Sequence, residues 1–336
     1  MNVNRSDLLK VLEIVKAGLS NKDIIEQATS FAFLGDRVAT YNDEVSISHP
    51  LNIGVIGAVK ATEFIQLLSK LRRDEIEINT TENEILLKCG KLKAGIIFQA
   101  KVTLPFDEIG SIDQKTWKRL PKTFAPQLKF AIQGCSKDMS TPILTCVNIR
   151  EDGYLVSSDN YRALQVGIGK EMPVQDFSLP NASASLVVSL SPTHIILETS
   201  WAHFKNAEGT VISCRIFEEE FPKTEHLFKV KGAQITFPKT IQSVLDRASV
   251  FYKQDHFIDE MIDINIQDNK LTVKGSSEAG WSEESCNMKY EGTAINFVVT
   301  PYLLKEILKM TNSCRVSENC LKFEGENWKY IAVLRK

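Results

Sequence analysis

No long apolar run occurs in this sequence of 336 residues, and none approaches the roughly 18 residues that a membrane-spanning helix needs. The N-terminal stretch MNVNRSDLLKVLEIVKAG carries charges throughout and predicts an amphipathic helix, which is unlike a secretory signal. We therefore expect a cytoplasmic protein with no membrane partner.

Cysteine is sparse and scattered. The seven cysteines are odd in number and form no CxxC pair, and no histidine-rich cluster accompanies them. This pattern predicts neither a zinc site nor a disulfide framework, so we expect reduced thiols. The five histidines occur outside GxSxG, HExxH and DxDG contexts, and no glycine-rich phosphate loop is present. We expect no metal, no cofactor and no enzymatic activity.

Two enzyme interpretations can still be written from the residues. Cys214 with His203 or His226 would supply a nucleophile and a base, and the run 218–220 would supply carboxylates for a metal ion. Cys214 lies in the alternating stretch TVISCRIF, which favours a buried structural thiol. A short glutamate run is typical of a solvated loop.

An excess of basic charge is also missing. The chain has 40 Lys and Arg against 42 Asp and Glu, which gives a formal net charge of −2. A compact nucleic-acid-binding protein usually has a basic excess, so this balance argues against tight, direct contact with nucleic acid. It does not argue against basic residues gathered on one face.

A threefold pattern is what the sequence does contain. Segments with apolar residues at helical spacing begin at Asp7, Thr123 and Thr240, which places them 116 and 117 residues apart. Each is followed by a hairpin signal, two alternating strands around a charged or glycine-containing turn, at 30–48, 146–166 and 263–285.

A second helix-plus-strands unit completes each third. It lies at 61–89 in the first third and at 300–325 in the last, whereas the helix of the middle unit, in 181–204, is predicted to be short and poor. The pattern predicts an α+β fold of three similar domains, each built from two helix-plus-strands units. We expect domains at 1–112, 113–230 and 231–336.

Charge follows the same division. Basic residues fall on the predicted helices, and acidic residues concentrate in hairpins and loops. A nearly neutral chain would then have a basic helical surface and an acidic strand surface. Helices whose charges are merely solvated give the same pattern, so this signal alone decides nothing.

The stretch LVSSDNYRALQV, residues 155–166, begins as a strand and then places six polar residues in a row. Asp159 and Arg162 in this stretch are candidates for a catalytic pair, an ion-pair support, or the wall of a binding site. The residues alone leave these three open.

Over its whole length the chain resembles the bacterial DNA sliding clamp, the beta subunit of the replicative DNA polymerase III. The resemblance is strongest at 270–308, with a glutamate-rich strand, a Tyr-x-Gly turn and a helix that opens on Tyr-Leu-Leu. SSDNYRAL (157–164) is similar to the family's A-T-D-G-x-R-L-A, and EEFPKTEHLF (219–228) to its G-x-F-P-D-Y.

The resemblance implies a ring of two subunits that encircles double-stranded DNA and slides on it as a polymerase processivity factor. Helices would line the hole, and weak, non-specific phosphate contacts would suffice because the link is topological. It implies partner proteins, a DNA polymerase and a clamp loader, that insert short linear peptides into a pocket. A clamp-fold scaffold that no longer acts in replication is the alternative.

The implied site residues fall into three groups. Lys22 and Lys137 would face DNA, and Val250 and Phe251 would lie at the dimer interface. The peptide pocket would comprise Ile143, Ser158, Asn160, Tyr161, Arg162, Ala163, Pro222, Leu227, Ile331, Val333 and Leu334. The last residues would wall the pocket without belonging to the core, and Asp159–Arg162 would support its wall.

The chain departs from the family pattern at the pocket. Asn160 stands where the family has Gly, Ala163 where it has Leu, and Lys223 and Thr224 where it has Asp-Tyr. The tail ends Val-Leu-Arg-Lys in place of Met-Pro-Met-Arg. We expect an altered pocket shape and hence altered partner specificity. The chain is also shorter than most bacterial clamps, as a phage or mobile-element version would be.

Overall fold

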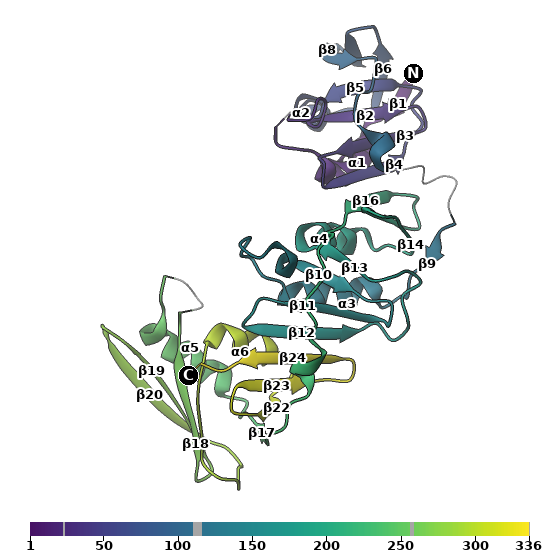
Figure 1. Cartoon of the computed structure of the whole chain (residues 1–336). Helices are drawn as coiled ribbons and strands as arrows, with labels where there is room; N and C mark the ends of the chain where they lie inside the picture. Colours follow the sequence, from purple (N-terminus) through teal and green to yellow (C-terminus); the bar gives the residue numbers. More distant parts are fainter. Residues whose placement is uncertain (23, 110–115, 256–258, 336) are drawn as a thin grey trace. The chain divides into compact units, whose positions relative to one another are not determined.

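A computed structural model of the chain describes residues 1–22, 24–109, 116–255 and 259–335 (Figure 1). They form two compact units. Unit 1 contains Met1–Lys129 and Met172–Glu218, and unit 2 contains Phe130–Glu171 and Glu219–Lys336. The predicted boundary between residues 112 and 113 lies outside the described residues, so the division into three domains stays a prediction.

The fold is α+β, as predicted, with helices at the six places where the sequence pattern put them. They are α1 (Arg5–Val15), α2 (Ala61–Lys70), α3 (Phe124–Ala131), α4 (Asn181–Leu190), α5 (Ile241–Tyr252) and α6 (Pro301–Ile307). The prediction of a short helix in the middle third was wrong, because α4 has 10 residues, as α2 does. Burial of Ala184 and Val187 compensates for the weak helix propensity of its serines. No helix in the described ranges is long and apolar enough to cross a membrane.

Unit 1 is built on one 12-stranded sheet, to which strands of both the first and the second third contribute. Its order is β1 (Asn2–Asn4), β6 (Glu75–Thr80), β7 (Glu84–Cys89), β8 (Leu92–Gln99), β5 (Ile56–Lys60), β2 (Ser30–Leu34), β3 (Arg37–Tyr41), β4 (Val45–Pro50), β16 (Val211–Arg215), β15 (Trp201–Lys205), β14 (His194–Leu197) and β9 (Lys118–Arg119). The short strand β13 (Phe177–Pro180) also belongs to this unit. The two thirds meet where β4 pairs with β16.

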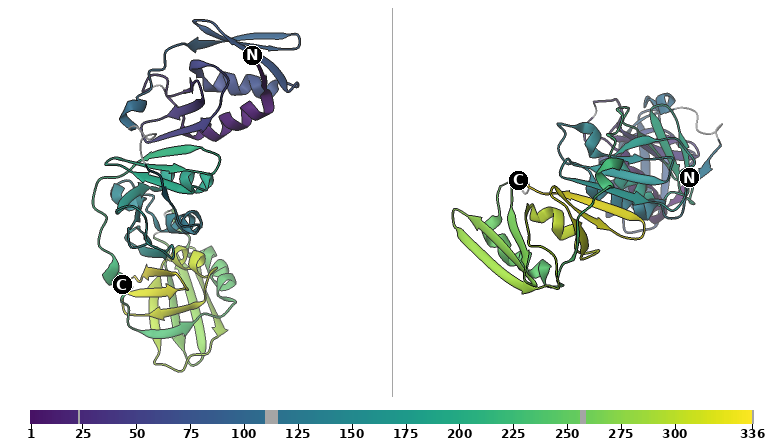
Figure 2. Two further views of the ribbon diagram at one scale, coloured as in Figure 1. Left: turned by 90° about the vertical axis from the view of Figure 1, so that its right-hand side faces the viewer. Right: turned by 60° about the horizontal axis from the view of Figure 1, so that its bottom comes forward.

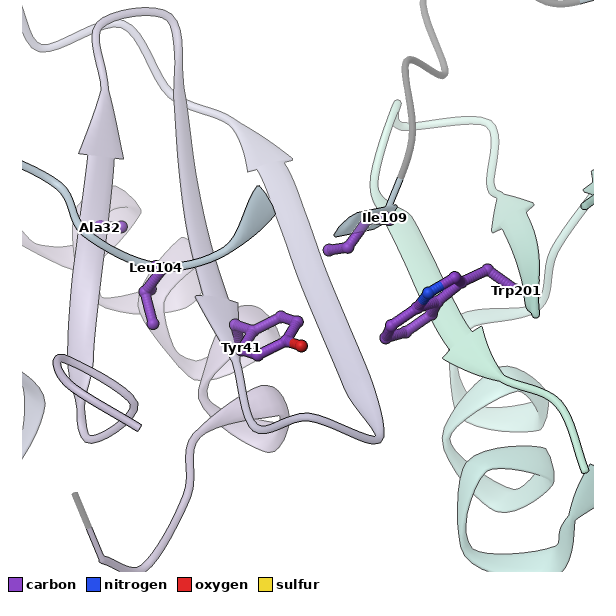
Figure 3. Close-up of a cluster of buried hydrophobic side chains, with 5 residues drawn as sticks. All are labelled: Ala32, Tyr41, Leu104, Ile109 and Trp201. Carbon is purple, nitrogen blue, oxygen red and sulfur yellow. The ribbon is translucent and has the colours of Figure 1, made fainter. Parts of the chain in front are cut away.

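A buried cluster in unit 1 ties a connecting segment to the sheet (Figure 3). Ala32 and Tyr41 from β2 and β3, Leu104 and Ile109 from the segment, and Trp201 from β15 make up this cluster. The Tyr41 and Trp201 ring centroids are 6.4 Å apart. The side chain of Gln27 fixes the segment, because its Nε2 donates to the Lys101 carbonyl at 2.9 Å and its Oε1 accepts from the Thr103 N–H at 2.9 Å.

Unit 2 contains two antiparallel sheets (Figures 1 and 2). The first runs β10 (Cys146–Ile149), β11 (Tyr154–Ser158), β12 (Arg162–Gly167), β24 (Trp328–Val333), β23 (Cys320–Glu324), β22 (Ser313–Val316) and β17 (Ala233–Thr236). The second runs β20 (Gly280–Asn287), β19 (Lys270–Ser277), β18 (Ile262–Gln267) and β21 (Ile295–Val299), and α5 packs on β19 and β20. Pairing of β12 with β24 joins the middle third to the C-terminal strand.

Candidate functional site

The turn between β11 and β12 holds the polar residues that the sequence singled out. Asn160 has a left-handed backbone with φ of 70°, which asparagine tolerates better than most residues and which a glycine would also adopt. Asp159 Oδ1 accepts the N–H groups of Tyr161 and Arg162 at 3.1 and 2.9 Å. Ser158 Oγ donates to the Arg162 carbonyl at 2.7 Å. These bonds fix the turn.

Asp159 and Arg162 also form a buried ion pair, with Arg162 Nε 2.9 Å from Asp159 Oδ2 and side-chain exposures of 11% and 5%. Burial raises the pKa of Asp159, and the nearby Arg162 and the two backbone donors oppose that rise. Burial lowers the pKa of Arg162, but Tyr330, Asp159 and Tyr302 together raise it above its ordinary value. Each charge needs the other, because an unpaired buried charge is costly. The pair supports the turn.

A cavity of about 510 Å³ lies beside this turn, all of it within unit 2. Its lining residues are Cys135, Ser136, Lys137, Asp138, Ser140, Thr141, Leu144, Asp159, Asn160, Tyr161, Arg162 and Tyr302. Three of the predicted pocket residues, Asn160 to Arg162, therefore line one cavity. Ile143 does not; it is 2% exposed, and its neighbour Leu144 lines the cavity in its place.

An apolar cluster adjoins the same strands. Ala163 and Ile331 are partners in the β12–β24 register, and both pack with Phe228 of the turn Glu225–Phe228. The Val333 N–H donates to the Tyr161 carbonyl at 2.8 Å. The structure thus brings together the three distant stretches 157–164, 221–228 and 331–334. Phe228 was missed by the sequence reasoning, which named only Leu227 from this turn.

The predicted pocket residues divide by exposure into support and surface. Ser158, Arg162, Ala163, Ile331 and Leu334 are buried, at 8% exposure or less. Pro222 is exposed, Leu227 is 37% exposed and Val333 is 39% exposed. These three carry the apolar surface that a partner side chain would meet, and the buried ones shape what lies beneath.

The C-terminal residues are more firmly held than the sequence indicated. Leu334 is 7% exposed and its N–H donates to the Asn319 carbonyl at 2.9 Å. The Arg335 N–H donates to the Val298 carbonyl at 2.8 Å, and its guanidinium lies 5.0 Å from the Tyr161 ring centroid. The expectation that the tail lies outside the core was wrong for Leu334.

The two lysines predicted to face DNA are both exposed, Lys22 in unit 1 and Lys137 in unit 2. Neither has an ion-pair partner within the ranges that the structure describes. The expectation that acidic residues avoid the helices was wrong. Lys10 pairs with Asp7 and Lys16 with Glu13 along α1, each at 3.3 Å, because residues three apart are neighbours on a helix surface.

The two residues predicted at a dimer interface lie at the end of α5. Val250 is 71% exposed and Phe251 is partly exposed. A Cβ at Gly280 would lie 3.2 Å from the Phe251 ring, so this end of α5 sits directly over the start of β20. Trp281, the next residue of β20, is 66% exposed.

Neither enzyme interpretation gains support. Cys214 is fully buried in an interior strand, and burial raises the pKa of its thiol, which makes it a poor nucleophile. The carboxylates of residues 218–220 are exposed, and Ser200 Oγ donates to Glu218 Oε1 at 3.1 Å. Across the described residues, no group of three or more His, Cys, Asp or Glu is placed to hold a metal ion.

The fold defined by these sheets and helices is that of the DNA sliding clamps. The beta subunit of the Streptococcus pyogenes DNA polymerase is similar with a TM-score of 0.86 at 18% identity, over 100% of this chain and 99% of that chain. The DNA polymerase III beta chain of Streptococcus pneumoniae gives 0.85 at 19% identity over 100% and 99%. The Bacillus subtilis DNA polymerase sliding clamp gives 0.84 at 16% over 100% and 98%. No protein-family model and no curated protein matches the sequence.

Proposed function

We propose that this protein is a DNA polymerase processivity factor, a homodimeric clamp that encircles duplex DNA, slides on it and tethers its partners. The supporting observation is the similarity of the whole chain to sliding clamps, with TM-scores of 0.83 to 0.86 and at least 98% of each of those chains covered. In this proposal the three domains are 1–112, 113–230 and 231–336, the role is non-catalytic and the protein works in the cytoplasm.

DNA contact would be weak and topological. Lys22 and Lys137 are exposed and without an ion-pair partner among the described residues, so both are available to phosphates. A ring needs few such contacts, because a closed ring stays on DNA without tight binding, and sliding requires that each contact break easily. The net charge of −2 is compatible with this mode.

Two strand edges, one in each unit, suit the closure of a ring by a second copy. β20 is the edge strand of its sheet. β8 pairs with β7 from Leu92 to Ile97 but with β5 only at Phe98 and Gln99, which leaves one edge of Leu92–Ile97 without a strand among the described residues. Exposed edges of this length usually find a partner, and a head-to-tail contact between two copies closes a ring.

Side-chain chemistry fixes one register for that contact. On β20, Trp281 and Glu283 are exposed, whereas Gly280 and Glu284 face α5 through Phe251 and Arg247. On β8, Lys93 and Gly95 share the exposed face with their partners Lys88 and Leu86 on β7. Placing Trp281 opposite Gly95 sets Glu283 opposite Lys93, which covers a glycine with an aromatic ring and pairs opposite charges.

Partner proteins would bind at the surface formed by Pro222, Leu227 and Val333 and at the adjoining cavity. A linear peptide with apolar anchors gains about 1.5–3 kcal/mol for each side chain that it fully buries. The costs of association subtract from that gain, so we expect roughly micromolar affinity for an isolated peptide. The DNA polymerase and the clamp loader are the proposed partners.

Retention on plasmid DNA tests the proposal. A clamp loaded on a nicked circular plasmid should remain bound through gel filtration and leave once the plasmid is linearised, because a ring slides off free ends. A scaffold that has lost the replication role would be retained on neither form. Equal retention on circular and linear DNA would contradict topological binding.

A further inference from the structure

A second cavity, of about 460 Å³, lies at the other end of β12 and β24. These strands pair from Arg162 and Ala332 at one end to Val166 and Trp328 at the other (Figure 1). At about 3.3 Å per residue, roughly 15 Å of strand separates the second cavity from the turn at Asp159–Arg162. Both cavities belong to unit 2, and neither occupies the other's residues.

Two aromatic rings wall this second cavity. Trp328 packs edge-on against Phe130, with ring centroids 5.8 Å apart. Tyr154 lies beside Gly167, where a Cβ would be 3.5 Å from its ring. The Gly167 N–H donates to the Asn327 carbonyl at 2.6 Å. The rings therefore stand on a fixed floor of backbone that carries no side chain at Gly167.

Polar groups at the second cavity are left without partners. The Trp328 indole N–H, the Tyr154 hydroxyl and the Gln165 carboxamide make no hydrogen bond to the described residues. Their inventory, two groups that both donate and accept and one that only donates, suits an occupant with several N–H groups and a planar shape. An apolar occupant would leave these groups unused.

Charge favours a cation in this cavity. Its four lining carboxylates, from Asp152, Glu171, Glu324 and Glu326, outnumber the ammonium groups of Lys170 and Lys329. Asp152 already pairs with Arg150 at 2.7 Å and Glu324 with Lys322 at 2.6 Å, whereas Glu171 and Glu326 have no ion-pair partner among the described residues. A phosphate would meet repulsion, so nucleic acid is disfavoured.

We propose that the second cavity binds an arginine side chain of an extended segment in a partner protein. A guanidinium is planar, stacks on tryptophan and tyrosine rings, and carries five N–H donors for the Gln165 and Glu326 oxygens. A lysine ammonium has the charge without the plane. Because the site is separate from the peptide surface proposed above, one clamp would hold partners at both ends of β12 and β24. The inference does not depend on the proposed function.

Titration of the full-length protein with acetyl-Gly-Arg-Gly amide tests this site. The readout is the indole ¹H–¹⁵N resonance of Trp328, identified by its absence in Trp328→Phe, a change that keeps a ring against Phe130. We expect a saturable shift with this tripeptide, a half-saturation concentration at least threefold higher for acetyl-Gly-Lys-Gly amide, and no shift with acetyl-Gly-Glu-Gly amide.

Variants at exposed positions separate the site from general charge effects. Glu326→Gln should raise the half-saturation concentration at least threefold. Glu318→Gln, an equal change of charge in the turn between β22 and β23, should leave it unchanged. An unsaturable response to the arginine tripeptide, equal responses to arginine and lysine, or a response to oligothymidylate at lower concentration would each overturn the proposal.

Discussion

At the scale of single residues, the pair Asp159–Arg162 shows why a motif that looks catalytic is structural. Both side chains are nearly inaccessible, at 11% and 5% exposure, and the carboxylate spends its oxygens on two backbone N–H groups and the guanidinium. A group that is fully engaged in this way holds a turn. It has no free oxygen with which to take a proton from a substrate.

We expect Asp159→Ala to lower the free energy of unfolding by about 3–5 kcal/mol, because it leaves Arg162 buried without its counter-ion. Urea denaturation measures the change. Asp152→Ala is the matched control, since Asp152 is 46% exposed in its pair with Arg150 and should cost less than about 1 kcal/mol. Equal effects of the two substitutions would remove the structural role from Asp159.

His49 makes the junction of β4 and β16 sensitive to pH. Its Nδ1 lies 2.7 Å from Thr210 Oγ1, and burial, with Arg37 nearby, lowers its pKa below the ordinary 6.5 although Glu208 opposes the shift. Below pH 6.5 the unfolded chain binds a proton that the folded chain does not, so stability falls as the pH falls.

His49→Gln should therefore flatten the decline in the free energy of unfolding between neutral pH and pH 5. Urea denaturation at a series of pH values measures it. His194→Gln serves as control, because His194 has no resolved shift of its pKa. A decline as steep in His49→Gln as in the unmodified protein would assign the pH dependence to other groups.

At the scale of elements, the edges of β8 and β20 carry a prediction about register. Lys93→Glu places like charges opposite Glu283 and should weaken the dimer at least tenfold, because a ring contains the contact twice and reversal converts attraction to repulsion. Lys93→Glu with Glu283→Lys should restore it. Sedimentation equilibrium measures the dissociation constant, and failure of the double variant to recover would reject this register.

Phe251 offers an independent test of the same interface, since it lies over the start of β20. If the interface is there, Phe251→Glu should convert dimer to monomer. A dimer that survives both Phe251→Glu and Lys93→Glu would place the contact on other elements.

The strand β24 supplies the pocket surface through one side chain. Removal of residues 333–336 would also delete the buried Leu334 and three backbone hydrogen bonds, so its effect on binding could not be separated from loss of stability. Val333→Glu is the cleaner change. It should weaken a peptide with Leu and Phe anchors at least tenfold and leave the melting temperature nearly unchanged, whereas Met310→Glu, at a residue 50% exposed, should alter neither.

At the scale of the whole molecule, the two exposed lysines carry a prediction about sliding. Lys22→Glu with Lys137→Glu should shorten retention on nicked circular plasmid and flatten its dependence on salt, because each phosphate contact releases a counter-ion. Gel filtration at several salt concentrations measures both. Lys70→Glu with Lys309→Glu is a matched control. Unchanged retention in the first variant would remove Lys22 and Lys137 from the DNA-binding surface.

The sequence by itself determined the α+β fold class and the position of all six helices, because apolar spacing of three and four residues and hairpin signals are local properties. It also indicated that stretches 157–164 and 331–334 belong to one site. The propensity of its residues understated α4, because the burial that stabilises this helix involves residues distant in the chain.

Only the tertiary structure decided which side chain of each stretch is buried and which is exposed. Leu227 and Phe228 are equally apolar neighbours, yet only Phe228 packs on Ala163 and Ile331. The pairing of β12 with β24 buries Leu334 and creates a cavity at each end, since strands 160 residues apart in sequence must meet before either cavity has walls. Cross-strand contacts of this range leave no local pattern in a sequence, and so they were decided by folding.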